Sequence, residues 1–112
     1  MPILNIQIIL QLKESKLLSK RLIAGAIAGD PEAAFTYAAL KKMPFPEGEA
    51  MIARSAYYSF MYASIVLDGR FEAGEKAIAN SMYGSEYASR ILEGKYGMTP
   101  EESRKWMIGL RP

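Results

Sequence analysis

The hydrophobic residues of this chain form helix-length runs that are separated by short polar breaks. Residues 56–67 include no charged side chain and are apolar on almost every side, which is typical of a helix with neighbours on most faces. A helix over 3–10 is favoured over a strand, although Leu4, Ile6 and Ile8 alternate, because no second strand is evident. Further helices are expected over 16–28, 30–42, 46–53, 72–79, 81–94 and from Thr99 to Ile108 or Gly109.

Residues that begin and end helices occur at the borders of these runs. Asp30 is a good N-cap with Pro31 at the first helical position, and Ser55 and Ser81 are N-cap candidates for the next two long helices. Gly69 stands where a glycine that ends a helix belongs. The sequence Thr99-Pro100-Glu101-Glu102 predicts a capping box.

Glutamates recur at the expected starts of the short helices. The pairs Glu47/Glu49 and Glu72/Glu75 lie where a helix dipole favours negative charge. A role at the helix start is therefore preferred over a general acid/base pair or a hard-metal site.

The chain contains an internal repeat with a period of 25–26 residues. The dipeptide Tyr-Ala recurs at 37, 62 and 87, and Phe45-Pro46-Glu47-Gly48-Glu49 matches Phe71-Glu72-Ala73-Gly74-Glu75. A divergent last segment is typical of a capping unit. The sequence thus predicts an all-α, single-domain stack of short helical hairpins, with an N-terminal cap, three sequence copies and a C-terminal cap over 1–28, 29–53, 54–79, 80–96 and 97–112.

Composition excludes several kinds of chemistry. The 112 residues include no histidine and no cysteine, so disulfides, thiolate-metal sites, thiol nucleophiles and histidine triads are absent. No enzyme activity and no cofactor are expected. The longest apolar stretches are about half as long as a membrane span requires, and no signal peptide is evident, so a cytoplasmic protein without membrane contact is expected.

The charge is unevenly distributed. Residues 1–27 carry four basic and one acidic side chain, 28–89 carry five and eight, and 90–112 carry five and three, which sum to a net charge of +2. Solvated helix faces explain most of this pattern. Contact between the protomers of a homodimer, or between a basic edge and an acidic partner, is the alternative.

The repeated pattern Asp-Pro-x-x-Ala-Phe/Tyr-x-Tyr-Ala, followed by Gly-Arg-Phe and Pro-Glu-Gly-Glu-x-x-Ile-Ala, resembles a short tandem helical repeat of poorly characterised tailed-phage and bacterial proteins. The resemblance extends over roughly residues 27–96 and departs at Met43-Pro44 and at Glu72. It implies a bacteriophage or prophage setting, in which small proteins often bind and disable a host protein.

Seven residues are candidates for partner binding. The tyrosines of the recurrent column are placed to form a ladder that stacks bases or grips a peptide, although packing between helices is the preferred interpretation. A basic and aromatic strip, and a tryptophan in the last helix, are further candidates. The residues are Tyr37, Tyr58, Tyr62, Tyr87, Arg70, Lys95 and Trp106.

The preferred function is non-enzymatic binding of a macromolecule, by a phage-encoded inhibitor of a host protein such as a defence or transcription component. Nucleic-acid binding through the basic termini and the edge formed by Arg70 and Lys95 is one alternative. Self-assembly through the apolar surface of 56–67 is another.

Overall fold

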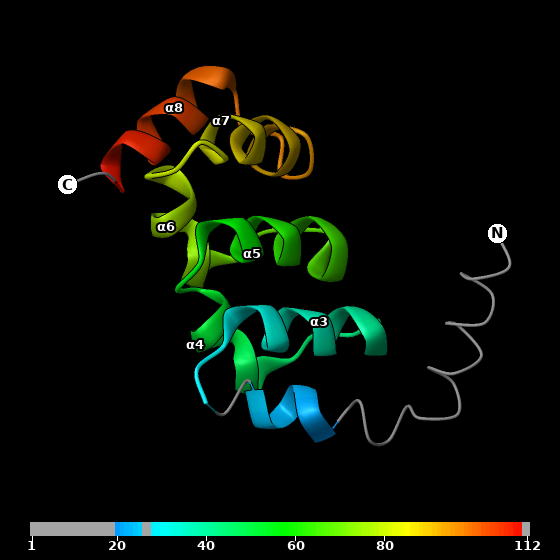
Figure 1. Cartoon of the computed structure of the whole chain (residues 1–112). Coiled ribbons are helices and arrows are strands. Elements are labelled where there is room, and N and C mark those ends of the chain that lie inside the picture. The colour runs from blue at the N-terminus through cyan, green and yellow to red at the C-terminus, as the bar shows by residue number, and fades with distance from the viewer. Residues whose placement is uncertain (1–19, 26–27, 111–112) are drawn as a thin grey trace, which may run out of the picture.

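The computed structural model describes residues 20–25 and 28–110, and every regular element within these ranges is helical (Figure 1). The expected all-α class is therefore confirmed. Residues 20–25 are helical and agree with the helix expected over 16–28, whereas the helix favoured over 3–10 lies outside the described residues. Among the described helices, none is long and apolar enough to cross a membrane.

Three long helical segments lie one above another. The first is α3 (Pro31–Lys41); the second is α5 (Ala56–Met61), continued without a break by the π-helical η2 (Tyr62–Leu67). The third is α7 (Gly84–Tyr87), continued by the π-helical η4 (Ala88–Glu93). The sequence predicted the long helices but not that the second and third end in π-helical turns.

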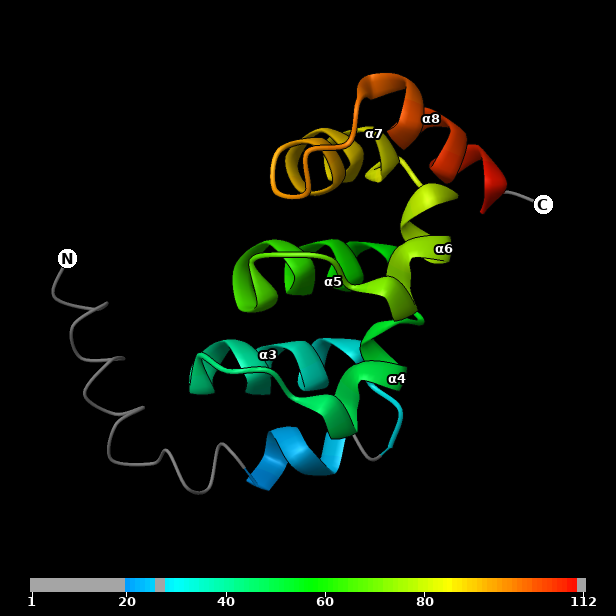
Figure 2. The ribbon, with the colours of Figure 1, turned by 180° about the vertical axis from the view of Figure 1, so that it is seen from behind.

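A short helical segment follows each of the first two long ones and lies to one side of the stack (Figure 1). Each begins as a 3-10 turn and continues as an α-helix: η1 (Pro46–Gly48) with α4 (Glu49–Ile52), and η3 (Glu72–Gly74) with α6 (Glu75–Ala79). Figure 2 shows the extended return segments that connect the long helices to the short ones. The third long segment is followed instead by α8 (Pro100–Gly109).

Most helix starts agree with the sequence. Asp30 accepts a hydrogen bond from the Glu32 amide, and Ser55 accepts one from the Tyr58 amide. Thr99 and Glu102 form the predicted reciprocal capping box at the start of α8. That contact lowers the pKa of the Glu102 carboxyl, because the ionised carboxylate accepts a hydrogen bond from the Thr99 amide.

Two predicted helix borders are wrong. Ser81 is not the N-cap of the third long helix; its hydroxyl donates to the Ile78 carbonyl and accepts from the Tyr83 amide, so it closes a turn, and α7 begins at Gly84. Gly69 does not adopt the left-handed conformation, which belongs to Asp68 (φ 48°), one residue earlier. The hydrogen bond from the Gly69 amide to the Ala63 carbonyl closes this wider turn.

The core runs through the stack between the long and short helices. Three buried alanines stand at equivalent places in the long helices, Ala38, Ala63 and Ala88, which lets the neighbouring segments approach closely. Ile52 and Ile78 are buried at the ends of the short helices. The alanines that recur every 25 residues are therefore core positions.

Candidate functional site

The tyrosines at 62 and 87 connect one sequence copy to the next. The Tyr62 hydroxyl donates to Glu49 Oε2 at 2.6 Å and accepts from the Phe45 amide at 2.9 Å. Both partners belong to the short helical segment of the preceding copy. One hydroxyl therefore joins the border of η1 to the first residue of α4.

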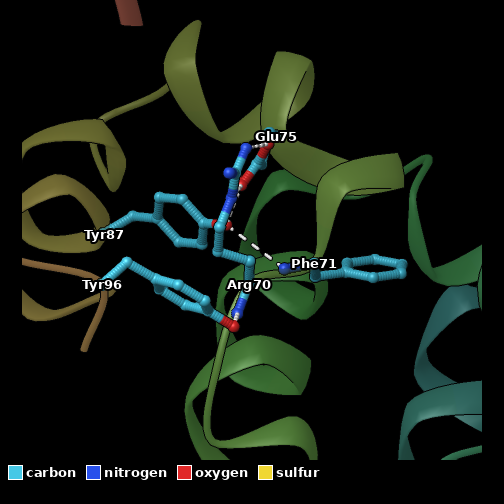
Figure 3. A network of polar contacts seen from close by, with 5 residues as sticks. All are labelled: Arg70, Phe71, Glu75, Tyr87 and Tyr96. Atoms are coloured by element: carbon cyan, nitrogen blue, oxygen red, sulfur yellow. Dashed lines mark hydrogen bonds and ion pairs between the residues drawn. The ribbon is translucent and has the colours of Figure 1, made fainter. Parts of the chain in front are cut away.

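Tyr87 repeats this arrangement one copy further along (Figure 3). Its hydroxyl donates to Glu75 Oε2 and accepts from the Phe71 amide at 3.2 Å. Arg70 adds two parallel hydrogen bonds to the same carboxylate, from Nε and Nη2, both at 2.9 Å. Glu75 is almost completely buried, so three donors satisfy a carboxylate that water does not reach.

These contacts shift the acid–base properties of the groups involved. Burial, followed by the hydrogen bond to the glutamate, raises the pKa of the Tyr62 and Tyr87 hydroxyls. The hydrogen bonds to Glu75 raise the pKa of Arg70. All three groups therefore keep their protons throughout the physiological range.

The glutamates of the short helices do not act as side-chain caps. Neither α4 nor α6 has a side-chain hydrogen bond at its N-cap, and the Glu49 and Glu75 carboxylates point to tyrosines of the next copy instead. The interpretation of these glutamates as helix-start residues therefore missed their tertiary role. The recurrent spacing of Phe, Gly, Glu and Tyr was the available signal.

The tyrosine ladder does not form a surface. Tyr62 and Tyr87 have no exposed area, so their side chains cannot belong to the binding surface that the sequence suggested. Their rings are separated by other residues: Tyr62 meets the edge of Phe71 at 4.8 Å between ring centres. Tyr37 is partly buried, with its ring 4.6 Å from that of Phe45 and with Lys41 near its face.

The candidate basic and aromatic strip is engaged within the protein. Arg70 is bound to Glu75 and lies over the rings of Trp106 and Tyr96, at 4.9 Å and 6.0 Å from the ring centres. Lys95 donates to Asp68 at 2.7 Å on the surface. Trp106 is partly buried. The structure thus brings Arg70 and Trp106 together, whereas Lys95 is paired with Asp68 on the surface.

A different set of aromatic residues, from α3, α5 and the residue before α7, forms a continuous row of ring contacts. Tyr57 is exposed, Phe35, Tyr58 and Tyr83 are partly buried, and Phe60 belongs to the buried core. We call these five rings, together with Met82 next to Tyr83 in the sequence, the aromatic edge. Phe35 contacts Tyr58 at 5.6 Å between ring centres, and Tyr58 contacts Tyr57 at 4.9 Å. Tyr57 contacts Tyr83 at 5.7 Å, and Tyr83 stacks on Phe60 at 5.6 Å. Met82, which precedes Tyr83, is 86% exposed, and Tyr57 is 44% exposed.

One end of the aromatic edge is acidic. Burial and the neighbouring Glu32 carboxylate raise the pKa of the Tyr58 hydroxyl, and Asp30 adds to the effect. The edge therefore offers a partner the exposed Tyr57 and Met82, beside partly buried rings and near two carboxylates. Among the seven sequence candidates only Tyr58 lies on it.

The sequence pattern did not single out Tyr57, Met82 and Tyr83, because the residue type at these positions changes from one copy to the next. Tyr57 and Met82 stand 25 residues apart, at the same place in successive copies, where the first copy has Glu32. Large side chains at an exposed place of two successive copies were the available signal.

Comparison of the chain with protein-family models, with curated proteins and with solved structures finds no match.

Proposed function

We propose that this chain is a non-enzymatic helical-repeat protein that binds another protein through its aromatic edge. The observation that carries the proposal is the run of contacting rings, in which Tyr57 is exposed, followed by the strongly exposed Met82 directly before Tyr83. Tyrosine, phenylalanine and methionine are the residues that protein interfaces favour over the rest of the surface.

The architecture we propose is a solenoid-like stack with a capping unit at each end. Its support is the recurrence of one set of contacts: a tyrosine hydroxyl, a glutamate and a phenylalanine amide at both Tyr62 and Tyr87. The segment after the third copy departs from this pattern, as a capping unit does. Such a stack holds side chains from successive copies in a fixed row, which suits a preorganised binding surface.

The resemblance to repeats of tailed-phage proteins adds a partner class. In that setting the partner is a host protein, such as a defence or transcription component, and binding disables it. The proposed location is the cytoplasm of the host cell.

The proposal is tested with two matched double variants. Tyr57→Ser with Met82→Ser removes the most exposed apolar side chains of the aromatic edge, and Leu40→Ser with Ile65→Ser removes two comparably exposed ones elsewhere on α3 and η2. A partner is first isolated from host lysate on the immobilised chain, identified by mass spectrometry and purified. Its dissociation constant is then measured for each variant by calorimetry.

We expect the edge variant to weaken binding at least about 30-fold, which corresponds to about 2 kcal/mol for loss of two interface anchors. The control variant stays within about threefold. Equal weakening by both variants, or failure to recover any stable partner, contradicts the proposal.

A further inference from the structure

A pocket of about 400 Å³ opens between the third long segment and α8. This volume lies within the range of roughly 300–1,000 Å³ that small-molecule sites occupy. Its lining comes from one side of α8, at successive turns, and from three small residues and one glutamate of α7 and η4. The lining residues are Gly84, Ser85, Ala88, Glu93, Pro100, Ser103, Arg104, Met107 and Ile108.

An aromatic pair lies at each of the two earlier junctions between long helices. Phe35 contacts Tyr58 between the first and second long helices, and Phe60 stacks on Tyr83 between the second and third. The members of each pair are 23 residues apart, and each pair follows the last by 25. The third copy has Ser85 in this register, 25 residues after Phe60, and Ser85 lines the pocket. The third copy thus lacks the ring that the first two copies have at this position.

The walls of the pocket suit a ring that carries a hydrogen-bond donor. The buried Ser103 hydroxyl donates to Glu93 Oε2 at 2.6 Å, which fixes the carboxylate. Within the described part of the chain, the second carboxylate oxygen of Glu93 has no hydrogen-bond partner. Met107 offers a thioether and Arg104 a guanidinium, both of which interact favourably with aromatic rings.

The protein already contains the kind of contact that a phenol would make with Glu93. At both junctions between copies a phenol hydroxyl donates to a glutamate carboxylate, Tyr62 to Glu49 and Tyr87 to Glu75. We propose that the pocket binds a phenol ring, the tyrosine side chain of a partner protein, with its hydroxyl on Glu93. This inference rests on the proposed function, because the pocket continues the aromatic edge beyond Tyr83 and Phe60.

Two small probes of matched shape test the pocket directly. In p-cresol the ring carries a hydroxyl, whereas toluene lacks it. Binding is followed by NMR of the methionine methyl groups in the full chain, in which Met107 lines the pocket and Met82 does not. We expect p-cresol to shift the Met107 signal with a dissociation constant of about 1 mM. Toluene binds at least about fivefold more weakly.

Two variants separate a ring site from nonspecific contact. Ser85→Phe restores the aromatic residue of the earlier copies and fills the pocket, so p-cresol binding falls at least about tenfold. Glu93→Gln keeps the pocket open but replaces the carboxylate with a neutral amide, which accepts a hydrogen bond more weakly, so the preference for p-cresol over toluene falls to about twofold. The exposed Ser89 gives the matched control, Ser89→Phe, which leaves p-cresol binding unchanged.

An unchanged Met107 signal with p-cresol, or equal shifts in wild type and Ser85→Phe, overturns the inference. If Ser85→Phe fails to fold, the p-cresol and toluene comparison in Glu93→Gln still decides. Failure here is distinct from failure of the proposed function, because the partner assay changes Tyr57 and Met82, neither of which lines the pocket.

Discussion

The two junctions between sequence copies use the same parts in different surroundings. At the first junction Glu49 is only partly buried and has no cation within bonding distance in the described structure; its hydrogen bond comes from Tyr62. At the second junction Glu75 is almost fully buried and binds Arg70 as well as Tyr87. A carboxylate removed from water requires a charge partner, whereas a partly exposed one does not.

The sequence difference that creates this contrast is Pro44 in place of Arg70. Proline supplies no cation and no backbone N–H. The Arg70 amide donates to the Tyr96 hydroxyl at 3.2 Å, and the residue that stands 25 positions before Tyr96 is Phe71, which has no hydroxyl. At the first junction Pro44 has no amide to donate and Phe71 has no hydroxyl to accept. The donor and the acceptor of this hydrogen bond are therefore absent together.

The largest expected effect comes from removing the buried carboxylate. Glu75→Ala leaves Arg70 and the Tyr87 hydroxyl without their acceptor, and we expect the free energy of unfolding to fall by about 3–5 kcal/mol. Glu49→Ala leaves only one hydroxyl unpaired and costs about 1–2 kcal/mol. Urea unfolding followed by circular dichroism measures both. An equal loss of unfolding free energy in both variants would show that the difference in burial between Glu75 and Glu49 has no effect on stability.

The exposed Glu72 on the same short segment gives the control for this pair. Glu72→Ala removes a charge without removing a buried contact, so it changes the free energy of unfolding by less than about 0.5 kcal/mol. A large effect of Glu72→Ala would assign the loss to the helix dipole instead.

The second expected effect concerns the glycines that precede these glutamates. A Cβ on Gly74 would lie 2.6 Å from the Ser59 Cβ, and Ser59 is held in the buried part of α5. A Cβ on Gly48 would lie 2.5 Å from the ring of Phe45, which is partly buried and can swing away. We expect Gly74→Ala to cost about 2–3 kcal/mol and Gly48→Ala about 1 kcal/mol.

Gly109→Ala is the matched control for both substitutions, because nothing lies within 4 Å of its Cβ position in α8. Alanine is the better helix former, so Gly109→Ala leaves the stability unchanged or raises it by up to about 1 kcal/mol. Thermal unfolding of the three variants measures the order. If all three variants are destabilised, the losses come from replacing a glycine in general and not from close contacts at the junctions.

The third expected effect isolates the tyrosine hydroxyls. Tyr87→Phe leaves the Phe71 amide and the Glu75 carboxylate without one partner each. Tyr62→Phe does the same to the Phe45 amide and to Glu49, which is only partly buried. We expect about 2 kcal/mol for Tyr87→Phe and about 1 kcal/mol for Tyr62→Phe. A double variant that costs the sum would show that the two junctions act independently.

The same hydroxyls predict a loss of stability at high pH. Their pKa is raised in the folded protein above the ordinary value of 10.0, so the folded state keeps protons that the unfolded state releases. The stabilisation is complete below pH 10 and decreases as the pH rises above it, by about 1 kcal/mol per tyrosine at pH 11. Urea unfolding at pH 8 and pH 11 measures the loss. An equal loss in the Tyr62→Phe, Tyr87→Phe double variant contradicts this assignment.

Much of the fold was predictable from the sequence because caps, prolines and apolar spacing act locally. Asp30, Ser55 and Thr99 begin their helices as expected. The π-helical ends of the long helices were not predictable, since they depend on how the turn closes in the folded protein. The left-handed conformation of Asp68 was not predictable either, because the neighbouring Gly69 can adopt that conformation more easily. The two copies of the tyrosine junction were visible as spacing, but the direction of the side chains was not.

The smallest expected effect contrasts the two cations of the predicted basic strip. Arg70 is 22% exposed and binds a buried carboxylate in two parallel hydrogen bonds, whereas Lys95 is 46% exposed and binds Asp68, which is 69% exposed. Solvent and salt screen the second pair, so Lys95→Ala changes the free energy of unfolding by at most about 0.5 kcal/mol. Urea unfolding at low and at 1 M salt measures it. A loss that persists at 1 M salt would mean that Lys95 stabilises the protein through more than this exposed pair.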